Sequence, residues 1–243
     1  MFPMRASSEP KGLSGAAIKW LALITMTVDH VGVLFFPNVI LLRVIGRLAF
    51  PLFGYMIAEG CAHTHDKGAY LARTAGLALL CQIVYFFAEG SLYMCILVTF
   101  SLAIVWIIAI DRVKTAPSAL SIVSVILTSA AVVFVCLGLP ALLPGTDFSV
   151  DYGLFGVVYV VCVYLGRSKT EKLLLGAAAL IGVALTSPIP FAIQICALFA
   201  LIPLYFYNGS RGKYNIKLFF YVYYPLHLAV LEGIYMLTRH IGA

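Results

Sequence analysis

The sequence predicts an all-α, polytopic membrane protein with about nine transmembrane helices, its N-terminus inside and its C-terminus outside. Hydrophobic residues make up 63% of the 243 residues and charged residues 11%, with a mean hydropathy of +1.03. An average soluble domain is about 25% charged. The apolar residues also form nine runs, most of them near the roughly 20 residues that a membrane helix needs. Residues 1–243 are therefore expected to form one integral membrane domain.

The nine predicted helices follow one another through short connections, without a linker or a soluble domain. The first run follows a polar start and has no small-residue cleavage site after it, so we expect an uncleaved first helix. The seventh and eighth runs are short and are separated only by Ser187-Pro188-Ile189-Pro190. The predicted helices span residues 17–36, 39–61, 69–88, 92–110, 118–139, 152–166, 173–187, 189–207 and 216–237.

The placement of Lys and Arg supports this order, because basic residues concentrate in cytoplasmic connections. With the N-terminus inside, 13 of the 16 basic residues fall in the inner segments 1–19, 62–73, 111–117, 167–172 and 208–217. The outer connections contain none. The net charge of +6 is therefore explained by the basic cytoplasmic connections, and no nucleic-acid partner is expected. The six cysteines are dispersed without metal-ligand spacing, so no metal site is expected.

Ionisable side chains interrupt the first two predicted helices at Asp29, His30, Arg43 and Arg47. Each charge costs roughly 2.5–3.5 kcal/mol on insertion scales, and such residues usually mark a functional site. At a rise of 1.5 Å per residue, Asp29 and His30 lie about 15 Å from the inner edge and Arg47 about 12 Å from the outer turn. In the last helix, His227 reaches a similar depth. Three helices therefore bring polar groups to one level.

Simpler interpretations of the same residues are also open. Asp29 and Arg47 could form a structural ion pair, and Arg43 could extend to the outer interface. His227 could be a core histidine beside Tyr223 and Tyr224, and Glu59 could be hydrated near the inner edge. Further candidates inside the membrane are Gln82 and Gln194. Pro51 and Pro225 each remove a backbone donor and free a carbonyl about one turn away.

The chemistry of the set suits proton abstraction. A histidine can take a proton from an amine or hydroxyl at neutral pH. Asp29 points about 100° away from His30 on a helix, so pairing with Arg47 is favoured over orienting the imidazole. An arginine can hold a phosphate or stabilise negative charge on a thioester oxygen. The sequence contains no Gly-rich phosphate loop, HExxH or GxSxG motif.

Several short motifs occur in a fixed order along the chain. They are Asp29-His30-Val31-Gly32, Gly46-Arg47, Ala49-Phe50-Pro51-Leu52-Phe53, Ala58-Glu59-Gly60, Asp151-Tyr152-Gly153 and the closing segment YVYYPLHL at 221–228. This ordered set resembles the TraX family, named for the conjugation protein that N-acetylates pilin. The region 90–150 matches the family pattern weakly.

The resemblance implies an acyltransferase of the bacterial inner membrane that uses acetyl-CoA or another acyl-CoA as donor. Its acceptor would be an amine or hydroxyl in the cell envelope, either a pilin-like peptide amine or a glycan. His30 is the expected general base, with Asp29 and His227 as further catalytic candidates. The expected substrate- or acyl-CoA-binding residues are Arg43, Arg47, Glu59, Gln82, Tyr224 and Asp151. No tightly bound cofactor or metal is expected, and the lipid bilayer is the remaining partner.

Two other function classes stay open. A proton-coupled transporter could use Asp29, His30, Arg47 and His227 as a relay. Against it, the number of predicted spans is odd and no internal repeat is evident. Alternatively, a non-catalytic assembly protein would use the same polar residues only to lock its helices together.

Overall fold

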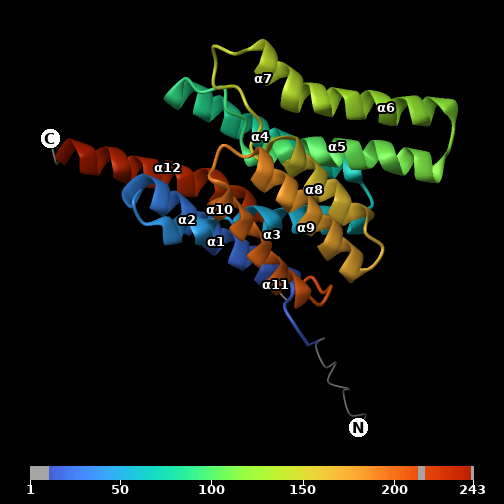
Figure 1. Ribbon diagram of the computed structural model, residues 1–243, viewed down its shortest axis with the longest axis horizontal. Coiled ribbons are helices and arrows are strands. Elements are labelled where there is room, and N and C mark those ends of the chain that lie inside the picture. Colours follow the sequence, from blue (N-terminus) through green and yellow to red (C-terminus); the bar gives the residue numbers. More distant parts are fainter. Residues whose placement is uncertain (1–10, 213–216, 242–243) are drawn as a thin grey trace, which may run out of the picture.

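The computed structural model describes residues 11–212 and 217–241, and these residues are helical without any strand (Figure 1). The helices are α1 (Gly15–Phe35), α2 (Ile40–Gly46), α3 (Ala49–His63), α4 (Lys67–Glu89), α5 (Ile96–Thr115), α6 (Ala119–Val133), the π-helical η1 (Phe134–Gly138), α7 (Leu139–Leu142), α8 (Gly153–Leu165), α9 (Lys169–Thr186), α10 (Phe191–Gln194), the 3-10 helix η2 (Ile195–Ala200), α11 (Leu201–Tyr205) and α12 (Lys217–Ile241).

The predicted all-helical class is confirmed. When adjoining pieces are joined, the described residues form nine helical segments in the predicted order. Five of these are long and apolar enough to cross a membrane: Gly15–Phe35, Ile40–His63, Lys67–Phe87, Ile96–Thr115 and Ala119–Leu142. Gly153–Leu165 and Phe191–Tyr205 are shorter apolar helices. The number of crossings and their orientation stay predictions.

The second predicted helix is not continuous. It breaks at Arg47 and Leu48, between α2 and α3. Pro51 is the third residue of α3, where a missing N–H leaves no intrahelical hydrogen bond unmade. The Tyr159 hydroxyl donates to the Pro51 carbonyl over 2.8 Å. The break therefore lets the proline begin a new helix instead of kinking an old one.

The interior is centred on α8, which packs against α3, α5 and α9. Tyr159 on α8 is fully buried and lies beside the ring of Phe50 from α3. A side chain at Gly54 or Gly176 would meet the Tyr159 ring at about 3 Å, so these glycines allow α3 and α9 to approach it closely. Within the described residues, α12 packs mainly along α1, at the side of the molecule (Figure 1).

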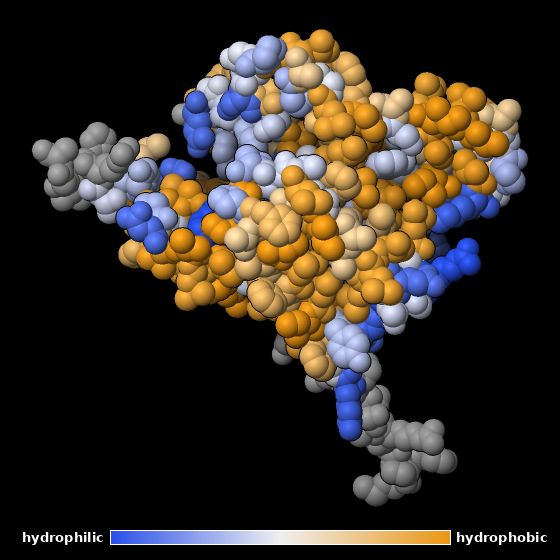
Figure 2. All heavy atoms as spheres, in the orientation of Figure 1, coloured by the Kyte–Doolittle hydropathy of each residue, from blue (hydrophilic) through white to orange (hydrophobic). Residues whose placement is uncertain are grey.

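The connections gather at two ends of the bundle with different charges. The basic end holds the connections at 11–14, 64–66, 116–118, 166–168 and 206–212, with most of the described Lys and Arg residues at or beside them. The acidic end holds the connections at 36–39, 90–95, 143–152 and 187–190, which contain Asp147 and Asp151 but no Lys or Arg. Figure 2 shows apolar side chains over most of the middle, with hydrophilic ones towards the ends. Arg5 and Lys213, counted above as inner charges, lie outside the described residues.

Each end is tied together by polar contacts. At the basic end, Asp111 of α5 pairs with Lys67 of α4 over 2.7 Å and accepts a hydrogen bond from Tyr164 of α8 over 2.6 Å. At the acidic end, Asp147 accepts hydrogen bonds from the Ser91 hydroxyl and the Leu92 amide, over 2.6 and 2.9 Å. The second tie fixes the segments 91–95 and 147–152 beside each other.

Candidate functional site

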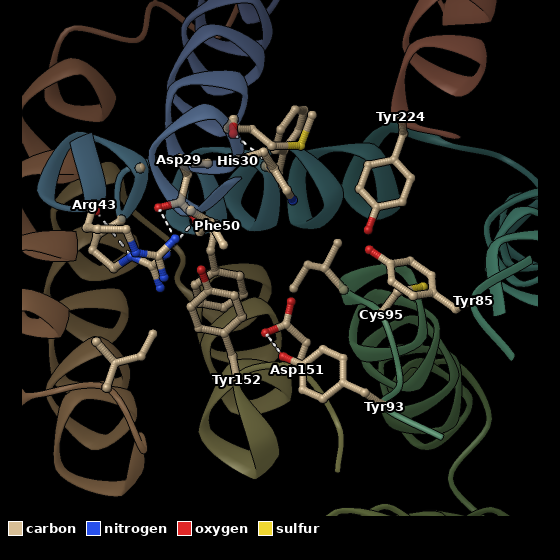
Figure 3. A pocket seen from close by; sticks show the side chains of 18 residues that line it. Asp29, His30, Arg43, Phe50, Tyr85, Tyr93, Cys95, Asp151, Tyr152 and Tyr224 are labelled. Atoms are coloured by element: carbon tan, nitrogen blue, oxygen red, sulfur yellow. Dashed lines mark hydrogen bonds and ion pairs between the residues drawn. The ribbon is translucent and has the colours of Figure 1, made fainter. Parts of the chain in front are cut away.

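A pocket of about 400 Å³ is lined in part by the acidic-end connections at 90–95, 143–152 and 187–190. One side is formed by α1, α2 and α3, and the other by the segments at 93–96 and 151–152 together with α4 and α12 (Figure 3). Its volume lies within the range of small-molecule sites, about 300–1,000 Å³. Of the polar residues predicted at one depth, Asp29, His30 and Arg47 line this pocket.

An ion-pair cluster forms the first wall. Asp29 of α1 pairs with Arg47 over 2.6 Å and with Arg43 over 2.9 Å. Arg47 also donates to the Gln194 amide oxygen and to the Arg43 carbonyl, both over 3.3 Å. The predicted pairing of Asp29 with Arg47 is confirmed, and Arg43 joins the same carboxylate instead of extending to the interface. We call Asp29, Arg43 and Arg47 the arginine wall.

Close contact between α1 and α2 makes this wall possible. A methyl group at Gly46 would overlap the Asp29 side chain. Gly46 ends α2, and Arg47 follows in the break before α3. The absent side chain therefore lets the carboxylate reach the guanidinium groups of Arg43, on α2, and of Arg47, directly after α2. The motif Gly46-Arg47 thus has a direct structural reason.

His30 follows Asp29 on α1 and lines the pocket between its two walls (Figure 3). Its Nδ1 lies 2.8 Å from the Met26 carbonyl oxygen. A carbonyl only accepts, so Nδ1 must carry the proton in this hydrogen bond. In the neutral ring, Nε2 then has a free lone pair and can take a proton from a bound group.

His227 stands behind His30 instead of on the pocket surface. The two rings meet edge to face with centroids 5.1 Å apart. The Nδ1 of His227 is hydrogen-bonded to the Tyr223 carbonyl over 3.0 Å, and the Tyr223 ring stacks on the His227 ring. The Tyr223 hydroxyl in turn bonds Thr27 of α1 over 2.8 Å. These contacts dock α12 on α1, and His227 is 6% exposed.

The opposite wall is built around Asp151, just before α8. The Tyr93 hydroxyl donates to its carboxylate over 2.6 Å. Burial raises the pKa of the Asp151 carboxyl to about 6, although the Tyr93 hydrogen bond and the charge of Arg47 oppose that rise. Burial likewise raises the pKa of Tyr93. The hydroxyls of Tyr85 and Tyr224 face each other beside this carboxyl (Figure 3). We call Asp151, Tyr85, Tyr93 and Tyr224 the tyrosine wall.

Two predicted binding residues lie outside the pocket lining. Glu59, at the end of α3, is ion-paired with Lys172 of α9 at the basic end and is 9% exposed. Gln82 supports the tyrosine wall from behind, because it donates to the Tyr93 carbonyl over 2.9 Å and accepts from the Cys95 amide over 3.4 Å. Glu59 is thus buried and paired, not simply hydrated. The roles of both residues stay predictions.

The structure adds lining residues that the sequence did not single out as binding residues. Tyr85, Tyr93 and Cys95 join the pocket from α4 and from the connection before α5. Tyrosines near the end of an apolar run are typical of a membrane interface, so nothing in the pattern distinguished these from anchors. Tyr152, a member of the motif Asp151-Tyr152-Gly153, also lines the pocket, with its ring stacked on Phe50 at 4.0 Å.

Comparison of the sequence with known proteins identifies a family and two relatives. Residues 14–235 match the family described as TraX protein. A probable fimbrial assembly protein FimC, serogroup H1, of Dichelobacter nodosus is 24% identical, over 90% of this chain and 94% of that protein. The uncharacterised protein RP591 of Rickettsia prowazekii (strain Madrid E) is 47% identical over 36 residues, 15% of this chain and 14% of that protein. No solved structure matches. Because the match covers most of the chain, the protein belongs to the TraX family.

Proposed function

We propose that this protein is an acyltransferase of the bacterial inner membrane. It would move an acyl group, most simply acetyl, from acyl-CoA to an amine or hydroxyl of an envelope acceptor. One observation carries the proposal: His30 lines a pocket beside two arginines, with its Nδ1 fixed by the Met26 carbonyl. Family membership and the relative named as a fimbrial assembly protein support an envelope acceptor.

The residues suit each step of the transfer. The Nε2 of His30 takes a proton from the acceptor nitrogen or oxygen, which attacks the thioester carbonyl carbon. Negative charge that develops on the carbonyl oxygen lies toward Arg43 or Arg47. The carbon–sulfur bond then breaks, and the CoA thiolate takes the proton from the imidazolium. His30 returns to its neutral form, so no cofactor is consumed.

The two ends of the bundle give the reaction a direction. By the positive-inside rule, the basic end faces the cytoplasm and the acidic end faces outward. An acyl-CoA donor is cytoplasmic, and its phosphates match the Lys and Arg residues of the basic end. The pocket is lined in part by connections of the acidic end. The acceptor would thus be met on the outer side, with His227 supporting His30 from α12.

The test is binding and loss of labelled acetyl-CoA by the purified full chain in detergent. Wild type is compared with His30→Gln, Arg47→Ala and the control His65→Gln, an exposed residue of the basic end outside the pocket lining. We expect the wild type and the control to bind and slowly deacetylate the donor. His30→Gln should bind but not turn over, and Arg47→Ala should lose turnover. Equal turnover by His30→Gln would remove His30 as the base.

A further inference from the structure

The two walls of the pocket carry opposite chemistry. The arginine wall holds two guanidinium groups around one carboxylate. The tyrosine wall presents a carboxyl group and phenol oxygens, and neither Lys nor Arg lines that side within the described residues. Figure 3 shows the Asp151 carboxyl pointing into the space between the walls. A ligand that spans the pocket therefore meets cationic donors on one side and, on the other, an acidic carboxyl beside phenol hydroxyls that can donate or accept.

Asp151 is held firmly in this position. Its side chain accepts from Tyr93 over 2.6 Å, and its backbone N–H donates to the Met94 carbonyl over 3.0 Å. Its own carbonyl accepts from the Thr99 hydroxyl over 2.6 Å. The neighbouring tie from Asp147 to Ser91 and Leu92 holds the same two segments together. A carboxyl fixed by contacts on both its side chain and its backbone is a preorganised binding group.

We propose that Asp151 determines acceptor specificity: the tyrosine wall binds the ammonium or hydroxyl groups of a neutral or cationic acceptor and rejects an acceptor that brings a carboxylate or phosphate there. This inference rests on the proposed acyl transfer. The thioester carbonyl then lies toward the arginine wall, and His30, between the walls, faces the acceptor nucleophile.

The discrimination follows from the charge and hydrogen-bonding capacity of the wall. Near neutral pH the carboxyl, whose pKa is raised to about 6, is mostly ionised and only accepts hydrogen bonds. Ammonium and hydroxyl groups donate to it, whereas a second anion beside it has no counter-charge on that wall. Specificity of this kind uses repulsion as well as attraction.

Three sugars with the same ring test the idea near neutral pH: glucosamine is cationic, glucose is neutral and glucuronate is anionic. Acetyl transfer from acetyl-CoA is measured with the full chain for wild type, Asp151→Asn and the control Asp66→Asn. Asn keeps the shape of the side chain and can still accept from Tyr93. Asp66 caps α4 at the basic end, outside the pocket lining. Thermal stabilisation by each sugar without acetyl-CoA gives a second measurement, independent of turnover.

We expect wild type and Asp66→Asn to favour glucosamine over glucuronate by about tenfold or more in kcat/KM, the size of one charge-assisted hydrogen bond. In Asp151→Asn this preference should fall to within about threefold. An unchanged preference in Asp151→Asn, or a wild type that favours glucuronate, overturns the inference while leaving His30-dependent transfer in place.

The second measurement separates this inference from the proposed function. If wild type does not turn over acetyl-CoA, the acyl transfer proposal fails, and the sugars' stabilising order decides the binding claim alone. Stabilisation by glucosamine that Asp151→Asn abolishes supports the binding claim. If none of the three sugars accepts an acetyl group and none stabilises the protein, the inference is overturned.

Discussion

The arginine wall provides a sharp test, because Asp29 is one carboxylate between two guanidinium groups. Replacing it with Asn keeps its shape but removes its charge. Arg47, only 4% exposed, would then lie next to Arg43 without the carboxylate that pairs with both. We therefore expect Asp29→Asn to destabilise the protein strongly.

The magnitude follows from burial. Removing one partner of a buried ion pair destabilises a protein by about 3–5 kcal/mol. Arg43 keeps 24% of its side chain exposed and can relax toward water, so we expect about 3 kcal/mol, at the low end of that range. Arg47→Met leaves Asp29 paired with Arg43 and should have a smaller effect. The double variant should be more stable than the sum predicts, with a coupling of about 1–3 kcal/mol.

Unfolding of the purified protein in mixed detergent and SDS micelles measures each free energy. The control is Asp29→Asn combined with Asp111→Asn at the basic end. Because these two sites are distant, their changes in the free energy of unfolding should add. If Asp29→Asn lowers the free energy of unfolding by less than about 1 kcal/mol, the reasoning is contradicted, since solvent-exposed ion pairs contribute that little. Simple additivity with Arg47→Met would contradict it as well.

Three further predictions concern stability and are checked by the same unfolding measurement. Gly46→Ala should destabilise by about 1–3 kcal/mol through overpacking against Asp29, whereas Gly76→Ala, in open space on α4, should not. Tyr159→Phe should lose about 1–2 kcal/mol because the Pro51 carbonyl loses its buried donor, and no loss would argue against that hydrogen bond. Burial raises the pKa of Asp151 from 3.8 to about 6, so the folded state holds a proton that the unfolded chain releases. Stability should therefore fall by about 2 kcal/mol as pH rises from about 4 to above 6, a slope that Asp151→Asn abolishes. Asp147 should act in the opposite direction: hydrogen bonds from Ser91 and Leu92 lower its pKa, so through this residue the protein should lose stability as pH falls. The same dependence of stability on pH in Asp151→Asn and Asp147→Asn would refute the assignment.

The helical architecture could be predicted because apolar run length and basic connections are local signals. Asp29 with Arg47 could be anticipated because both lie at one depth in neighbouring helices. The break at Arg47 and Leu48 could not, because Pro51 is compatible with either a kinked helix or a new helix start. The π-helical turn at Phe134–Gly138 has no signal in an apolar run.

The tyrosine wall was harder to predict than the arginine wall. Tyr93 meets Asp151 only because the segment at 91–95 is tied to the one at 147–152, which is 55 residues away along the chain. The hydrophobic periodicity of the sequence does not predict such a contact between two connections. Glu59 illustrates the converse, because a charge inside a motif proved to pair with Lys172 at the other end of the bundle. Depth along a helix can be estimated from sequence, but loop pairing cannot.

The central claim is that His30, and not His227, takes the proton. A single-turnover measurement of acetyl loss from acetyl-CoA by the full chain tests it most directly, with His30→Gln and His227→Gln side by side. The account predicts that His30→Gln lowers the rate by about 100-fold or more, the size of general-base catalysis, while His227→Gln keeps most of it. Loss of the rate in His227→Gln with retention in His30→Gln would contradict the account.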